Sequence, residues 1–572
     1  MKKLSILAAI FLSVSGFSQK MMSPELKKAL DNPDMVRSLD LTSNDLSGIP
    51  VEIKQLKDIY FLNISDNSIT FLPDELCELK QMSMLNASNN SLSRLPKCFG
   101  NLSQLHEILA ANNELTELPE SICDMDSLET LDVSQNNISR LPEKFGNLTI
   151  MRILDANGNE ISALPKSIIN LTNLVHLGLS DNNINALPSG MENMGMIQYL
   201  DLSGNQFSKT PKPIYNMKSL TDLNLSRNQI KSVSDKISGL KNLEYLDIES
   251  NDLSKLPKGI CELDKLISLH VEHNHLTELP AEIGKLSNLN TINAKDNQIV
   301  SLPASITKLN HLYELYLSSN GLVLLPDDFG DLKTLSKLNL EDNFITELPE
   351  SIGQLTLLED LYLGGNQITT LPDEIGKCSK LLRLDLSRNQ LTSIPETVDQ
   401  LVLISELNLR ENQLTTLPDE IGAMNGLTEL SLNENQLTEL PNTIGALSNL
   451  ASLSLDGNLL KSLPEDFGDL TNLQRLYLQG NQIKKLPPSF TNLKNLAYLN
   501  MDANNLKALP KNISDLKNLN YLSLENNALK MLPESIGELT NLKTLLLKGN
   551  LFSEKEMQRI KELVPKDCEV RF

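Results

Sequence analysis

Apolar and polar residues follow one pattern that returns every 23 residues along almost the whole chain. In residues 312–334, LYELYLSSNGLVLLPDDFGDLKT, leucines stand at the first, fourth and sixth positions, and Asn320 follows after two serines. The alternation in L-x-L puts successive side chains on opposite faces, which predicts one short strand per repeat. Because all strands recur in the same sense, they are expected to pair in parallel and to bury their leucines against neighbouring repeats.

An asparagine stands at one position of every repeat, from Asn44 to Asn550 in steps of 23 residues. The repeats are numbered 1 to 23 by these asparagines. The backbone leaves the predicted strand here with unpaired amide groups, and a carboxamide can both accept and donate hydrogen bonds there. We therefore interpret this column as scaffold. A second column lies six residues later and holds 21 of the 26 prolines; the short segment after it predicts 3₁₀ turns or one-turn helices.

The frame L-x-x-L-x-L-x-x-N-x-L resembles the leucine-rich repeat, and the tail L-P-x-x-I-x-x-L is similar to its 23-residue class. The resemblance covers residues 36–552. It implies an α/β fold: a right-handed solenoid, or horseshoe, with a concave parallel β-sheet and short 3₁₀ or helical turns on the convex side.

The two ends of the chain depart from the repeat. Lys2 and Lys3 precede an apolar run and small residues, which is typical of a bacterial secretory signal peptide over residues 1–18. Residues 19–35 are expected to form an N-terminal helical cap, and residues 553–572 a C-terminal cap of one helix and a short strand. No stretch reaches the roughly 18 to 20 apolar residues of a membrane span. We expect an exported protein of the bacterial type, located in the periplasm, on the cell surface or in the medium.

Charge and motifs narrow the function. The formal net charge is −22, which disfavours nucleic acid as a partner. The sequence contains no phosphate-binding loop ending in Gly-Lys-Ser or Gly-Lys-Thr, no H-E-x-x-H and no G-x-S-x-G. It therefore predicts a monomeric, non-enzymatic protein without cofactor or metal, which binds a protein or glycan on its concave face.

The six cysteines do not make a disulfide framework. Cys77, Cys98 and Cys123 lie in consecutive repeats, so Cys98 is able to reach either of the other two. Cys378 replaces a core leucine and is interpreted as an inert buried thiol.

Tyrosine is concentrated on the outward strand positions, which hold seven of the ten tyrosines. Its large area, few rotamers and polar tip suit recognition of peptide or sugar. In repeats 20–22, Arg475, Tyr498 and Tyr521 fall in one column on adjacent strands, with Tyr477 beside them. The alternative is that tyrosine merely packs on its neighbours in an exposed strand. The candidate ligand-binding residues of this kind are Tyr316, Tyr362, Arg475, Tyr477, Tyr498 and Tyr521.

A second candidate is acidic and falls in repeats 5–11. Asp201 and Asp247 belong to the central outward column, and Glu249, His270 and Glu272 lie where neighbouring strands bring them together. This set suits a basic or cationic ligand; a divalent cation and a solvated face are the alternatives.

A third column alternates in charge, and its members are expected to neutralise one another: Glu314, Lys337, Asp360, Arg383 and Glu406.

The leading interpretation of the whole sequence is an exported binding module. Three alternatives remain. The resemblance also implies an intracellular repeat scaffold that binds a GTPase or phosphatase, and a purely structural spacer in the envelope is another possibility. The third is an enzyme similar to ubiquitin ligases, which would need a large catalytic domain after the repeats, whereas only a short segment follows Asn550.

Overall fold

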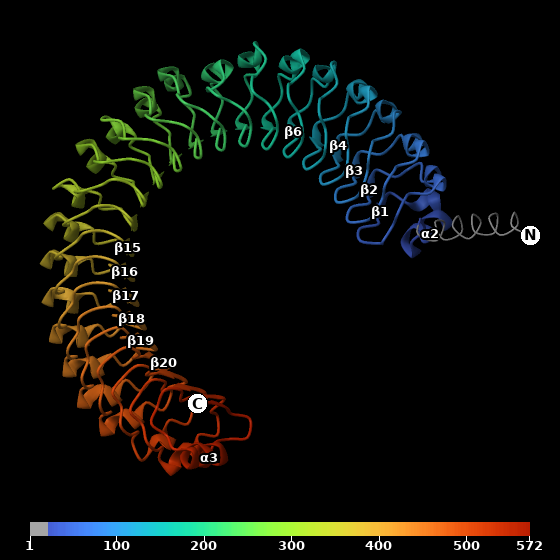
Figure 1. Ribbon diagram of the computed structural model, residues 1–572. Helices are drawn as coiled ribbons and strands as arrows, with labels where there is room; N and C mark the ends of the chain where they lie inside the picture. The colour runs from blue at the N-terminus through green and yellow to red at the C-terminus, as the bar shows by residue number, and fades with distance from the viewer. Residues whose placement is uncertain (1–20) are drawn as a thin grey trace, which may run out of the picture. The chain divides into compact units, whose positions relative to one another are not determined.

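A computed structural model describes residues 21–572, so the predicted signal peptide lies outside the described residues. The chain divides into two compact units, the first ending at His275 and the second running from Leu276 to Phe572. In each unit the strands form one side, and 3₁₀ turns form the other (Figure 1). No helix among residues 21–572 is long and apolar enough to cross a membrane.

The first unit has one strand of three residues in each repeat. Neighbouring strands pair in parallel with a register of 23 residues, so that Leu200 stands opposite Leu177 and Leu223. The strands are β1 (Ser38–Asp40), β2 (Phe61–Asn63), β3 (Met84–Asn86), β4 (Glu107–Leu109), β5 (Thr130–Asp132), β6 (Ile153–Asp155), β7 (His176–Gly178), β8 (Tyr199–Asp201), β9 (Asp222–Asn224), β10 (Tyr245–Asp247) and β11 (Ser268–His270).

The second unit continues the same arrangement, and its strands also pair in parallel at 23 residues. They are β12 (Thr291–Asn293), β13 (Glu314–Tyr316), β14 (Lys337–Asn339), β15 (Asp360–Tyr362), β16 (Arg383–Asp385), β17 (Glu406–Asn408), β18 (Glu429–Ser431), β19 (Ser452–Ser454), β20 (Arg475–Tyr477), β21 (Tyr498–Asn500), β22 (Tyr521–Ser523), β23 (Thr544–Leu546) and β24 (Glu569–Arg571).

The segments after the prolines are 3₁₀ turns of three or five residues, such as η8 (Met191–Asn193) and η9 (Lys212–Asn216). The expected solenoid fold with short 3₁₀ turns is therefore confirmed. The first unit begins with helix α2 (Pro24–Asp31), whose N-cap Ser23 accepts a hydrogen bond from the Leu26 amide. Helix α3 (Glu554–Leu563) precedes β24 at the other end of the chain.

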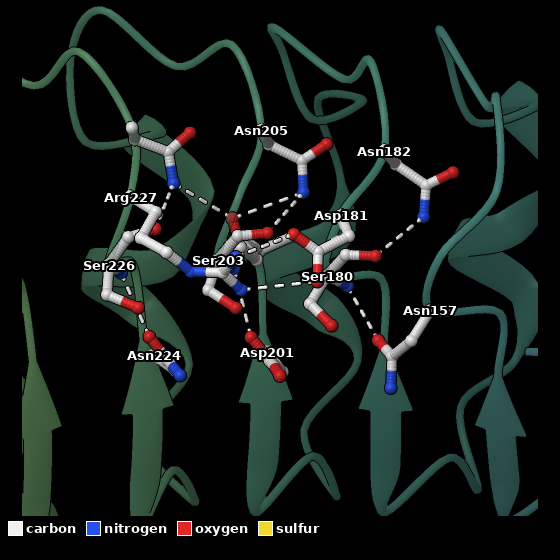
Figure 2. A network of polar contacts seen from close by, with 12 residues as sticks. Asn157, Ser180, Asp181, Asn182, Asp201, Ser203, Asn205, Asn224, Ser226 and Arg227 are labelled. Carbon is white, nitrogen blue, oxygen red and sulfur yellow. Dashed lines mark hydrogen bonds and ion pairs between the residues drawn. The ribbon is translucent and has the colours of Figure 1, made fainter. Parts of the chain in front are cut away.

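The asparagine column forms the hydrogen bonds that its chemistry predicts (Figure 2). Asn205 Nδ2 donates to the carbonyl oxygens of Leu202 and Ser203 in its own repeat, at 3.2 and 3.1 Å. The same nitrogen donates to the Leu179 carbonyl of the preceding repeat at 2.8 Å, while Oδ1 accepts from the Ile184 amide at 2.9 Å. One buried side chain thus joins two repeats, because its amide carries both donors and an acceptor.

The residue before each of these asparagines has a positive φ in all 23 repeats. Seventeen of them are not glycine, for example Asp181 at 50° and Arg227 at 52°. A left-handed residue turns the chain sharply out of the strand, and outside glycine it is uncommon. We call this position the left-handed column; it was not predicted from the sequence.

The described residues contain one disulfide and four free cysteines. Cys98 bonds to Cys77 rather than to Cys123, which remains a buried thiol. Cys378 is fully buried in the leucine core, and burial raises the pKa of its thiol to about 12, so it is poorly reactive at neutral pH.

Candidate functional site

The last position of each strand has a structural role that changes the interpretation of the acidic candidates. Thirteen of the 23 repeats carry Asp or Asn there, and in each the side-chain Oδ1 accepts a hydrogen bond from the amide two residues later. Asp201 accepts from Ser203 at 2.9 Å and Asp247 from Glu249 at 3.0 Å. These carboxylates cap the strand exit, as short side chains with an acceptor oxygen do in turns. With 8% of its surface exposed, Asp201 offers little to a ligand.

The remaining acidic candidates contact one another, as the sequence predicted. His270 Nδ1 lies 3.6 Å from Glu272 Oε1, and its Nε2 lies 2.8 Å from Ser268 Oγ. Burial, together with a hydrogen bond to Glu272 and the charge of Asp247, raises the pKa of Glu249 to about 7. The hydrogen bond to Glu272 also raises the pKa of His270. We call Asp201, Asp247, Glu249, His270 and Glu272 the acidic belt.

The acidic belt is therefore largely occupied by its own interactions. Within the described residues, no group of three or more His, Cys, Asp or Glu side chains has an arrangement that could hold a metal ion. The raised pKa of Glu249 favours its protonated form, and protonation there relieves the repulsion between two close carboxylates.

The left-handed column carries two ion pairs that span a glycine. Arg227 reaches over repeat 8 to Asp181, at 2.9 and 3.2 Å (Figure 2). A Cβ at Gly204, which lies between them, would stand 2.2 Å from Asp181 Oδ1. Arg388 pairs with Asp342 at 3.0 Å in the same way. These charges are satisfied within the scaffold, so they are weak candidates for ligand contacts.

In the alternating column of repeats 13–17, four of the five residues form the expected ion pairs, and Glu406 forms none among residues 21–572. Lys337 bonds to Glu314 at 2.8 Å and Arg383 to Asp360 at 2.7 Å. Arg383 Nε also donates to the hydroxyl of Tyr362 at 3.2 Å.

Two tyrosine candidates accompany this column. Burial, reinforced by the neighbouring Glu314 carboxylate, raises the pKa of Tyr316. Tyr316 and Tyr362 thus lie among charged groups that satisfy one another, in repeats 13 and 15. The structure does not group them with the tyrosines of repeats 20–22.

Three tyrosines of repeats 20–22 form a continuous aromatic surface, which we call the tyrosine ladder. The ring centroids of Tyr477 and Tyr498 are 5.0 Å apart, with the planes tilted by 42°. Tyr498 and Tyr521 stack at 4.4 Å with planes 5° apart. All three side chains are half-buried, and burial beside Tyr521 raises the pKa of Tyr498 to about 12. Tyr498 therefore stays neutral at ordinary pH.

Arg475 belongs to the same column but turns away from the ladder. Its Nη2 lies 3.2 Å from Glu429 Oε1, two strands away, across the small side chain of Ser452. Both charged side chains are about half exposed, at 49% and 53%. The structure thus brings Tyr477, Tyr498 and Tyr521 together and leaves Arg475 at their edge.

These features define a leucine-rich repeat solenoid. A model described as "Leucine-rich repeat region" matches residues 134–225 and 269–344. A model described as "Leucine rich repeat" matches residues 34–92, 210–253, 356–414, 403–460, 425–483 and 448–506. No curated protein sequence matches the chain.

Solved structures give more particular likenesses. The plant peptide hormone receptor RGFR1 in complex with RGF2 is 27% identical over 92% of this chain and 89% of that chain, with a TM-score of 0.74. The Arabidopsis receptor kinase HAESA, in complex with the peptide hormone IDA and the co-receptor SERK1, is 29% identical over 90% and 87%, with a TM-score of 0.65. YopM from Yersinia enterocolitica is 26% identical over 96% and 93%, with a TM-score of 0.54. The likeness to receptors in complex with peptides supports a protein-binding role.

Proposed function

We propose that this chain is a non-enzymatic binding module that holds a segment of a protein ligand on the strand face of its second unit, with the tyrosine ladder as the main contact. The observation that carries the proposal is the ladder itself. Three adjacent rings give a wide, neutral and rigid surface, and tyrosine is enriched where binding energy concentrates.

The rest of the strand face favours this location over the others. In the acidic belt and in the column of repeats 13–17, the polar groups already bond to one another or to the backbone. A ligand there would have to replace those bonds. At the ladder it needs only to cover the outer surfaces of the rings, which releases water from apolar area.

We further propose that the protein is exported. The leader-like residues 1–18 motivate this, and the Cys77–Cys98 disulfide supports it, because such bonds persist in oxidising compartments. Mass spectrometry of the native protein provides the test. A chain that starts at Gln19 in the envelope or the medium and has Cys77 joined to Cys98 agrees with export; a reduced chain retaining Lys2 in the cytosol contradicts it and favours the intracellular scaffold.

Binding is tested by selecting displayed random dodecapeptides on the immobilised protein and measuring their affinity by fluorescence anisotropy. We expect enriched peptides to bind the wild type and to lose binding to the triple variant Tyr477→Ala, Tyr498→Ala, Tyr521→Ala. The matched control is Tyr199→Ala, which removes a tyrosine stacked on His176 at 4.2 Å in the first unit. Unchanged affinity of the triple variant, with its circular dichroism intact, contradicts the proposal. An array of neutral glycans provides the comparison with a sugar ligand.

A further inference from the structure

Four lysines occupy one column of repeats 19–22, which include the three repeats of the tyrosine ladder. They stand three residues after the repeat asparagine, at a position that is Ser or Thr in 15 of the 23 repeats. Lysine occurs there in five repeats, and four of these are consecutive. We call Lys461, Lys484, Lys507 and Lys530, from repeats 19–22, the lysine row.

The lysine row is exposed and has no acidic partner in the described part of the chain. All four side chains are exposed, and none takes part in an ion pair or side-chain hydrogen bond among residues 21–572. The surrounding segments 459–462, 482–485, 505–508 and 528–531 add a fifth lysine, Lys485, and contain no Asp or Glu. The equivalent segments of repeats 13–18 contain no lysine and two glutamates, Glu347 and Glu439.

Such a row has an energetic cost in the free protein. Neighbouring repeats are spaced by about 4.8 Å at the strands, so like charges on successive repeats repel one another. In a chain with a net charge of −22, acidic residues are abundant, yet in the equivalent segments of repeats 18–23 they stand only at the two ends of the row, as Glu439 and Glu554. Elsewhere Lys337 is neutralised by Glu314 and Arg383 by Asp360, in each case from the preceding repeat. An anionic partner would relieve the repulsion along the row.

Between the tyrosine ladder and the lysine row, the left-handed column holds small residues in three of the four repeats. The chain leaves β20 at Tyr477, turns at Gly480 and reaches Lys484 seven residues after the tyrosine. In repeats 19–21 the left-handed column holds Gly457, Gly480 and Ala503 in succession. A Cβ at Gly480 would meet no atom closer than 3.5 Å. The space over Gly480 is therefore open, whereas the Glu434 carboxylate of the preceding repeat covers Gly457, where a Cβ would lie 2.6 Å from Glu434 Oε1.

We propose that the lysine row binds a short acidic segment of the same protein ligand whose neighbouring residues cover the tyrosine ladder; this inference rests on the proposed function. Three strand spacings of about 4.8 Å span about 14 Å, the length of four or five extended residues. The fit is to a peptide with a local cluster of Asp or Glu.

A long polyanion fits this surface poorly. In the same repeats Asp456, Asp502 and Glu525 stand two residues before the asparagine, and Glu439 adjoins the row in repeat 18. A uniformly charged nucleic acid or sulfated glycan extending beyond the row would meet these carboxylates and the net negative charge of the chain. A protein segment is able to place acid residues only where the lysines are.

The test uses the full chain and the displayed dodecapeptides described above. The variant replaces Lys461, Lys484, Lys507 and Lys530 with Gln. Its matched control replaces Lys209, Lys231, Lys255 and Lys258, which are exposed lysines of repeats 8–10, with Gln and so changes the net charge equally. We expect wild-type and control proteins to enrich peptides with clustered Asp or Glu beside aromatic or aliphatic residues. The lysine-row variant should lose the acidic cluster and bind the wild-type peptides about tenfold or more weakly, from four ion pairs of modest strength.

The outcomes separate the two proposals. Enrichment of neutral peptides that depend on the tyrosine ladder overturns the acidic inference and leaves the proposed function standing. Failure of the wild type to enrich any peptide contradicts both. Heparin or single-stranded DNA that binds more tightly than the selected peptides, and loses this binding only in the lysine-row variant, overturns the choice of a protein segment. Affinity for the acidic peptides should also fall between about 50 and about 300 mM salt, whereas neutral versions with Gln for Glu should show little change.

Discussion

The acidic belt of the first unit and the tyrosine ladder of the second occupy the same kind of position, the outward side of the strands, but differ in what they leave for a partner. In the belt, the oxygens of Asp201 and Asp247 bond to backbone amides, and burial together with Glu272 raises the pKa of Glu249. In the ladder, the rings contact one another and their outer surfaces stay accessible. A cluster of charges is thus a weaker indication of binding than a neutral surface whose interactions are incomplete.

The largest expected difference concerns the central ring of the ladder. Tyr498→Ala removes the ring that contacts both neighbours, and a central aromatic side chain of this kind typically contributes 2 kcal/mol or more to binding, or roughly a 30-fold change in Kd. We expect this loss in anisotropy measurements with a selected peptide. Glu249→Gln in the acidic belt should leave the same Kd unchanged. Equal effects of the two substitutions would remove the distinction between the regions.

The fold could be predicted from the sequence because every repeat carries the same pattern of structural residues. Three kinds of residue recur every 23 residues: the leucines of L-x-L, the asparagines equivalent to Asn205, and the prolines that follow them. So regular a recurrence identifies a repeat fold, and it assigns the three columns to the core, the strand exit and the turn. The tyrosine ladder was also grouped correctly, since register follows directly from a 23-residue spacing.

The candidate sites were less predictable because the sequence does not show where a side chain finds its partner. Asp201 and Asp247 look like ligand-binding carboxylates, yet they cap the strand exit. The signal was present, since Asp or Asn stands at that position in 13 repeats, and a position shared by these two residue types indicates a role in the scaffold. Arg475 was placed beside Tyr498 by register alone, and its ion pair with Glu429 depends on the small Ser452 between them.

A moderate effect on stability is expected at Asp201. Asp201→Ala leaves the Ser203 amide without its acceptor, and the loss of such a cap typically costs about 1 kcal/mol. Asp201→Asn should restore most of this, because Asn224 caps Ser226 at 2.9 Å in the next repeat. Urea unfolding measures both variants. If Asn were as damaging as Ala, the carboxylate charge would matter and the acidic belt would need a different explanation.

A smaller effect should appear as a pH dependence of stability to which Glu249 and His270 of the acidic belt contribute. The folded-state pKa values of Glu249 and His270 are raised, so the stability that they contribute is complete below their unfolded pKa values and is lost as pH rises through the folded ones. The window for Glu249 runs from its ordinary value of 4.5 to about 7. The lowered pKa of Glu272 acts only below its ordinary value of 4.5, outside this window.

We therefore expect the wild type to melt on the order of 2 °C lower at about pH 8 than at about pH 6, and Glu249→Gln to lose part of this difference. Tyr498 titrates only near 12, so a variant of the tyrosine ladder should keep the wild-type pH dependence. Differential scanning calorimetry of the three proteins at both pH values provides the measurement. A pH dependence that Glu249→Gln leaves intact would place its origin elsewhere.

The smallest effect should come from the ion pair at the edge of the ladder. Arg475 and Glu429 are both about half exposed, and exposed pairs contribute between 0 and about 1 kcal/mol, so Glu429→Gln should barely change the stability. Binding of acidic peptides should become tighter, because the substitution releases the Arg475 guanidinium from its ion pair. Arg475 stands opposite Tyr498 on the neighbouring strand, so its positive charge then becomes available beside the tyrosine ladder. We expect acidic peptides to bind about two- to threefold more tightly at low salt and neutral ones to bind as before. A weaker affinity for acidic peptides would mean that the pair itself positions the ligand, and Arg475 would then belong with the tyrosine ladder rather than at its edge.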